Sequence, residues 1–128
     1  PHFALDKNSC YPDAGGYSLL IKNEYYHELM FYYGILNSKL FWSFIMSTST
    51  VFNNNYYYFK TAYIKEFRFP DFVEESTKMQ VIDYVIDILN TKKIDSQKST
   101  FEIESKIDRL VYDMYELTED EIKRVEEM

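Results

Sequence analysis

A long apolar stripe in the N-terminal half constrains the fold more than any other feature of this 128-residue chain. Between residues 26 and 47, apolar side chains recur three and four positions apart, which is the spacing of one face of an α-helix. The pattern predicts one long helix, buried on most sides, in which Gly34 allows close packing and binds no ligand. The stripe consists of Leu29, Tyr33, Leu36, Leu40 and Phe44, widened by Ile35, Phe41 and Ile45.

Short strands are predicted on both sides of this helix. Aromatic and β-branched residues after a Gly-Gly turn indicate a strand at residues 17–22, and an Asn-rich loop leads to a second strand at residues 56–59. A helical turn over residues 61–66 follows, and then an extended segment over residues 67–70, because Pro70 disfavours helix in the residue before it. Residues 1–72 are therefore expected to form a small lobe of short strands around the long helix.

The remaining residues, 73–128, have the character of helices. Two apolar stripes separated by a polar connector at residues 92–96 predict an antiparallel helical hairpin. Thr118 followed by Glu121 forms a capping-box pattern that predicts a short C-terminal helix. The expected fold class is α+β, with a domain boundary between residues 72 and 73. The stripes are Met79, Ile82, Val85, Ile86, Leu89 and Ile103, Ile107, Leu110, Val111, Met114.

Charge is distributed unevenly along the chain. The formal net charge is −7. Six basic residues balance six acidic ones up to Phe72, whereas eight basic residues face fifteen acidic ones from Val73 onward. Binding to nucleic acid rewards Lys and Arg placed against phosphates. If DNA is the ligand, the N-terminal part is expected to meet it and the acidic part to face away.

The common catalytic constellations are not evident in the sequence. His2 and His27 lack the spacing of a metal site, and Cys10 is the only cysteine. The chain has no Gly-rich phosphate loop, no nucleophile elbow and no adenine-methyltransferase motif. Its clustered carboxylates fall on predicted helix surfaces, where solvation explains them. We therefore expect neither a catalytic site nor a metal site in this segment.

Composition also bears on location. The sequence has no run of about 18 apolar residues and does not begin like a signal peptide. With a single cysteine, a reducing, cytoplasmic setting without a membrane is expected. The apolar start at Pro1, without an initiator Met, suggests a piece of a longer protein.

Four blocks of sequence form an ordered set of motifs. They are Tyr33-Gly-Ile-Leu-Asn-Ser-Lys-Leu40, Thr50-Val-Phe-Asn-Asn-Asn-Tyr-Tyr-Tyr-Phe-Lys60, Tyr63-Ile-Lys-Glu-Phe-Arg-Phe-Pro70 and Ile107-Asp-Arg-Leu-Val-Tyr-Asp-Met-Tyr-Glu-Leu-Thr-Glu-Asp-Glu-Ile122. In their order and spacing, which span most of residues 28–125, the chain resembles the TaqI-like C-terminal specificity domain of restriction–modification enzymes. One departure is Asn53-Asn-Asn55, where the family usually has a Gly-containing turn; Asn also tolerates left-handed backbone.

The resemblance implies a parent protein with an upstream adenine-N6 methyltransferase core that uses S-adenosylmethionine. Whether the parent also carries a nuclease that uses magnesium stays open. The segment itself would bind double-stranded DNA without a cofactor, while Leu36, Asn37 and Ser38 would stabilise the fold. Asn can pair with adenine edges, and Lys or Arg with guanine or phosphate. The candidate DNA contacts are Asn53, Asn54, Asn55, Tyr56, Lys60, Lys65 and Arg68.

Two other functions fit the sequence. In the first, the segment is part of a specificity subunit whose helices bind separate methyltransferase subunits as a coiled-coil spacer, although the two stripes are short for that role. In the second, it is a protein-interaction module without a DNA role, as the acidic tail and the 23 Tyr and Phe residues would allow.

Overall fold

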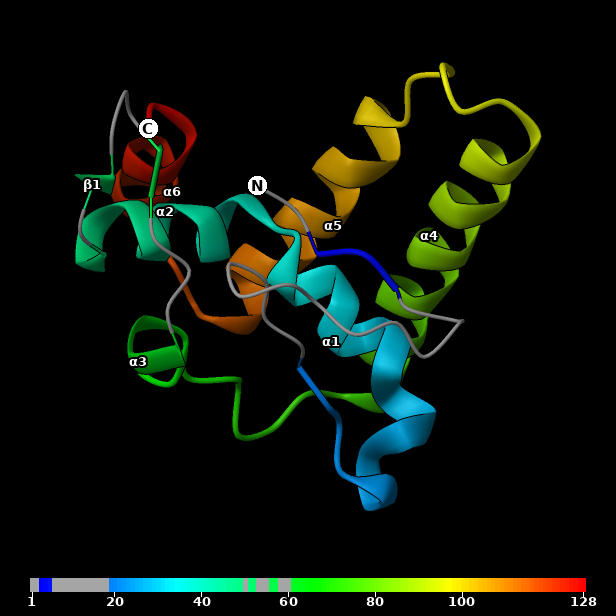
Figure 1. The fold of residues 1–128 in the computed structure, drawn as a ribbon, viewed down its shortest axis with the longest axis horizontal. Helices are drawn as coiled ribbons and strands as arrows, with labels where there is room; N and C mark the ends of the chain where they lie inside the picture. Colours follow the sequence, from blue (N-terminus) through cyan, green and yellow to red (C-terminus); the bar gives the residue numbers. More distant parts are fainter. Residues whose placement is uncertain (1–2, 6–18, 50, 53–55, 58–60) are drawn as a thin grey trace.

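The computed structural model describes residues 3–5, 19–49, 51–52, 56–57 and 61–128. Helices dominate the described chain (Figure 1). In order, the elements are the 3₁₀-helix η1 (Asn23–Glu28), α1 (Leu29–Leu36), α2 (Lys39–Thr48), β1 (Val51–Phe52), β2 (Tyr56–Tyr57), α3 (Thr61–Ile64), α4 (Glu75–Ile94), α5 (Phe101–Met114) and α6 (Glu119–Glu126).

The predicted single helix over residues 26–47 is wrong, because this range is divided among η1, α1 and α2, and the apolar stripe is split between α1 and α2. The chain breaks at Asn37 and Ser38. The Ser38 hydroxyl donates to the Ile35 carbonyl (2.6 Å) and accepts from the Phe41 amide (3.3 Å), so it closes α1 and caps the start of α2. A Ser side chain offers the backbone this alternative to a continuous helix.

The predicted α+β class is also wrong. Residues 19–22, the described part of the first predicted strand, form no strand, and the described part of the second predicted strand forms β2, Tyr56–Tyr57. In the described chain, β1 and β2 form only a two-residue antiparallel ladder, with Val51 opposite Tyr57. Aromatic and β-branched residues favour strands only where neighbouring strands take up their backbone hydrogen bonds. Here most of the apolar residues pack between helices instead.

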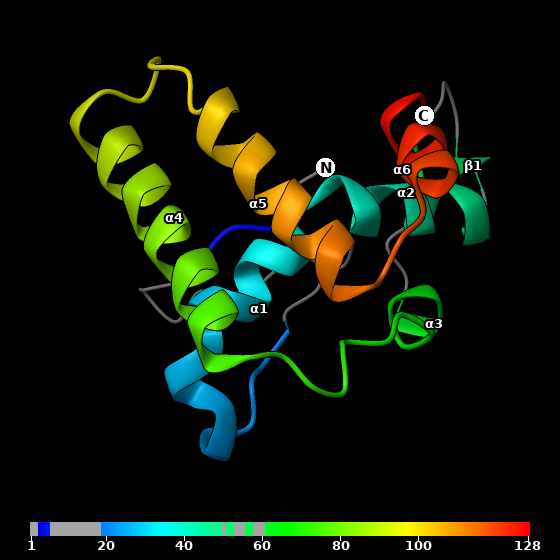
Figure 2. The ribbon, with the colours of Figure 1, turned by 180° about the vertical axis from the view of Figure 1, so that it is seen from behind.

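The helices expected in the C-terminal part are confirmed. Helices α4 and α5 lie side by side and antiparallel (Figures 1 and 2). Their connector lies at residues 95–100 and not at the predicted 92–96, because α4 continues through Lys92 and Lys93 to Ile94. The capping box of α6 is formed, since Thr118 Oγ1 accepts from the Glu121 amide and the Glu121 carboxylate accepts from the Thr118 amide. The predicted helical turn at residues 61–66 is present as α3.

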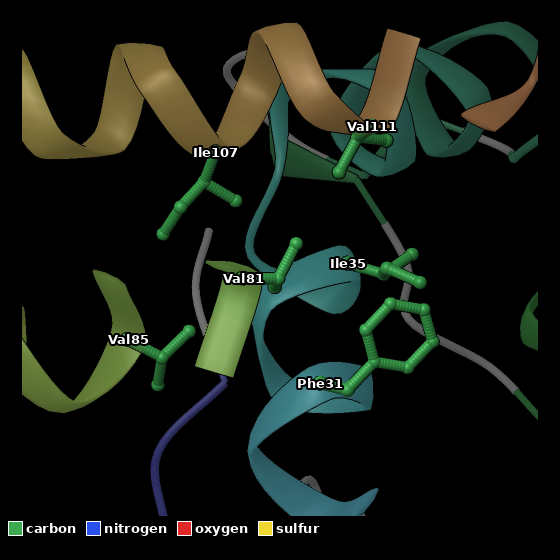
Figure 3. Packing of buried hydrophobic residues seen from close by; sticks show 6 residues of the cluster. All are labelled: Phe31, Ile35, Val81, Val85, Ile107 and Val111. Carbon is green, nitrogen blue, oxygen red and sulfur yellow. The ribbon is translucent and has the colours of Figure 1, made fainter. Parts of the chain in front are cut away.

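Helix α1 packs against both α4 and α5, and the apolar core lies between the three (Figure 3). Gly34 is expected to allow close packing, and this is confirmed: a Cβ atom there would lie 2.9 Å from Val81 Cγ1 and 3.1 Å from Val85 Cγ2. The core therefore draws on residues from both sides of the predicted 72/73 boundary. Its buried members are Phe31, Ile35, Val81, Val85, Ile107 and Val111.

Candidate nucleic-acid interface

The structure describes only some of the seven predicted DNA contacts. Asn53, Asn54, Asn55 and Lys60 lie outside the described residues. Tyr56 belongs to β2, where its backbone pairs with that of Phe52. The remaining two, Lys65 and Arg68, are exposed and lie three residues apart in the connection between α3 and α4. The described part of the candidate interface is therefore this connection.

The connection is held by the aromatic ring of Phe67. Its centroid lies 4.9 Å from that of Phe41, 5.3 Å from that of Phe44 and 5.6 Å from that of Phe69. Phe69 in turn contacts Tyr32 with a centroid separation of 5.0 Å. In an extended chain, alternate side chains project to opposite sides. Packing of residues 67 and 69 thus leaves the side chain between them exposed to solvent.

A hydrogen bond fixes the backbone at the same place. The hydroxyl of Tyr115, which follows the last residue of α5, donates to the Arg68 carbonyl at 2.6 Å. Burial raises the pKa of Tyr115 above its usual value, so the phenol keeps the proton it donates at neutral pH. This contact could not be predicted from the sequence, because its two residues lie 47 positions apart.

The basic side chains of the first part differ in their surroundings. Lys39 donates from Nζ to Glu126 Oε2 at 2.6 Å and is therefore engaged within the fold. By contrast, neither Lys65 nor Arg68 forms an ion pair with another described residue. Both side chains are exposed to solvent.

Helices α2, α5 and α6 meet at a polar cluster that the sequence did not predict. Asp108 Oδ1 accepts from the Lys39 amide at 2.9 Å, which gives a hydrogen-bond partner to one of the backbone amides in the first turn of α2. Glu126 accepts from both Lys39 Nζ and the Tyr112 hydroxyl, each at 2.6 Å. Burial of Asp108 raises the pKa of its carboxyl group to about 6. These polar groups are hydrogen-bonded to one another, so the cluster is a joint that connects α2, α5 and α6.

A second cluster of hydrogen-bonded polar side chains lines a pocket of about 410 Å³ near η1. Buried Glu28 accepts from Lys78 Nζ at 2.6 Å and from the Tyr32 hydroxyl at 3.3 Å. The hydrogen bond from Lys78 lowers the pKa of Glu28, so the ion pair persists at neutral pH. The pair ties η1 to α4. Within the described residues, no group of three or more His, Cys, Asp or Glu side chains is arranged to hold a metal ion.

An apolar groove of about 360 Å³ lies next to the candidate interface. One wall belongs to the connection that carries Lys65 and Arg68, and residues 19–22 form another. Leu20 on its rim is 93% exposed. The groove is lined by Leu19, Leu20, Ile21, Lys22, Tyr25, Tyr32, Leu36, Phe41, Ile64, Phe67 and Phe69.

No protein-family model, no characterised protein and no solved structure matches this chain. The likeness to TaqI-like specificity domains therefore stays a prediction from the motifs. None of the helices in the described ranges is long and apolar enough to cross a membrane.

Proposed function

We propose that this chain is the sequence-specific DNA-recognition module of a restriction–modification protein and that it has no catalytic role itself. The observation that carries the proposal is the α3–α4 connection. It presents Lys65 and Arg68 to solvent without ionic partners among the described residues, on a backbone held by Phe67 and Tyr115. Cations on a fixed backbone can contact phosphates or guanine without a large ordering cost.

The proposed division of labour follows from charge and from the motifs. Phosphate contacts from the connection would set the position of the module on the duplex, and Asn53–Asn55 with Tyr56 and Lys60 would supply base contacts. The parent protein would flip and methylate adenine in an upstream core that binds S-adenosylmethionine, and would use magnesium if it also cleaves DNA. The module and its parent protein would both operate in the cytoplasm.

Charge reversal in the connection tests the proposal. The double variant Lys65→Glu/Arg68→Glu should weaken binding to random duplexes, measured by fluorescence anisotropy over a series of salt concentrations. The slope of log K against log salt should become shallower by roughly two, because about 0.9 counterions are released per phosphate contact.

The matched control is Lys93→Glu/Lys98→Glu, which makes the same change in net charge. Both residues are exposed and lie near the end of α4 that Figure 1 places far from α3. The control should bind DNA with nearly the wild-type slope. If the two double variants have the same slope, Lys65 and Arg68 are not the DNA-binding residues and the proposal fails.

A protein-interaction module is the second candidate, and the exposed apolar rim of the groove favours it. It would be preferred if neither double variant altered DNA binding. The coiled-coil spacer has weaker support, because α1 already packs against the face between α4 and α5.

A further inference from the structure

We infer that Tyr115 is a positioning residue: it holds the backbone of Arg68 so that the guanidinium group is presented to DNA. The inference rests on the proposed function, since it assigns Arg68 a contact with nucleic acid. Its starting point is the 2.6 Å hydrogen bond from the Tyr115 hydroxyl to the Arg68 carbonyl, which joins the C-terminal helices to the candidate interface.

The connection depends on contacts of this kind because residues 67–70 belong to no helix or strand. The amide of Phe67 donates to the carbonyl of Ile64, the last residue of α3, at 3.1 Å, and the carbonyl of the next residue, Arg68, accepts from Tyr115. The Tyr115 ring also lies against Phe67, with 5.9 Å between centroids. Tyr115 thus contacts two consecutive residues of the connection, one through its ring and one through its hydroxyl.

Tyr115 is itself fixed by the way α5 ends. Glu116 adopts a left-handed backbone with φ of 54°. Its amide bonds to the Asp113 carbonyl, and the Leu117 amide bonds to the Tyr112 carbonyl at 3.1 Å. This pair of hydrogen bonds is the Schellman motif, which closes a helix at a defined residue. The side chain that reaches the connection therefore starts from a well-defined backbone position.

Tyr112 provides an internal control one helical turn earlier. Its hydroxyl also makes a 2.6 Å hydrogen bond, but to Glu126 of α6. Tyr112 and Tyr115 therefore make equally short hydrogen bonds to different parts of the molecule. Removing either hydroxyl should cost similar stability, and only one removal should affect DNA.

The experiment compares Tyr115→Phe with Tyr112→Phe in the 128-residue chain. Thermal unfolding followed by circular dichroism should show a small loss of stability for each. Affinity for duplex DNA should fall about two- to tenfold for Tyr115→Phe, the range expected for one hydrogen bond, and stay at the wild-type value for Tyr112→Phe. The salt slope of Tyr115→Phe should stay near the wild-type value, because the charge of Arg68 is kept.

A double-mutant cycle separates positioning from a general loss of stability. In an Arg68→Ala background, Tyr115→Phe should not weaken DNA binding further, because the side chain that it positions is gone. Equal DNA affinities for Tyr115→Phe and Tyr112→Phe, or additive effects in the cycle, would overturn the inference. The proposed function would survive either result, since it depends on charge reversal at Lys65 and Arg68.

Discussion

The molecule is held together by different means in its three-helix core and at its C-terminal helix. In the core, six apolar side chains from α1, α4 and α5 are each at most 5% exposed. Helix α6 contributes no buried residue and is tied to α2 and α5 through Glu126, which accepts hydrogen bonds from Lys39 and Tyr112. Apolar burial sets global stability and is insensitive to pH, whereas a titratable joint is local and depends on pH.

The largest effect is expected in the core. Ile35→Ala, at a fully buried position, should lower the free energy of unfolding by about 2–5 kcal/mol because it removes apolar contacts and leaves a cavity. The control is Ile94→Ala, at a position that is 89% exposed, which should change stability by about 0.5 kcal/mol or less. Urea denaturation measures both. Similar losses for the two variants would contradict the assignment of the core to α1, α4 and α5.

An intermediate effect is expected from Asp108 in the joint between α2 and α5. Its folded-state pKa of about 6 exceeds the unfolded value of 3.8, so its contribution to stability is full below 3.8 and is lost as pH rises through about 6. The unfolding free energy should therefore fall by about 1–2 kcal/mol between about pH 5 and pH 8.

Asp108→Asn tests the source of this pH dependence. The amide oxygen can still accept from the Lys39 amide, but the side chain no longer titrates. Denaturant titrations at several pH values should show a flatter profile for the variant. Glu28 and Glu126, whose pKa values are lowered, contribute stability that is lost only as pH falls below their usual range, outside this window. A profile as steep as that of the wild type would rule out Asp108 as the cause.

The smallest global effect is expected at α6. Glu126→Gln removes the ion pair with Lys39, but the two side chains are 40% and 42% exposed, so the unfolding free energy should change by about 1 kcal/mol or less. Amide hydrogen exchange should nevertheless accelerate in α6 and stay unchanged in α4. Glu127→Gln makes the same charge change beside a partner on the same helix, Lys123, and should leave exchange in α6 near the wild-type rate.

The elements that could be predicted from sequence are those specified by neighbouring residues. The stripes of α4 and α5 and the capping box at Thr118 and Glu121 depend on residues only a few positions apart. The helix break at Ser38 could not be predicted from periodicity, because the apolar spacing continues through it. The hydrogen bonds of the Ser38 hydroxyl close α1 and cap α2 despite that spacing. Residues 19–22 were wrongly predicted to be a strand, because a short apolar run fits a strand and a helix-packed core equally well.

The candidate site shows the limit of local patterns more clearly. Lys65 and Arg68 were selected for their charge, and the structure adds that both are exposed and without ionic partners among the described residues. The contacts that organise their surroundings join residues far apart in sequence. Tyr115 lies 47 positions from Arg68, and Asp108 lies 69 positions from Lys39. No spacing rule links such pairs before the fold brings them together.

The close approach at Gly34 also limits how the molecule can move. With Val81 and Val85 methyl groups 2.9 and 3.1 Å from the position that a Cβ atom would take, sliding α1 along α4 would bring side chains into collision with backbone. Shear between packed helices, a common way for domains to adapt to a ligand, would therefore have to break this close packing. If the chain binds a duplex as proposed, we expect any adjustment to it outside the core, in segments such as the connection at residues 65–72 and the attachment of α6.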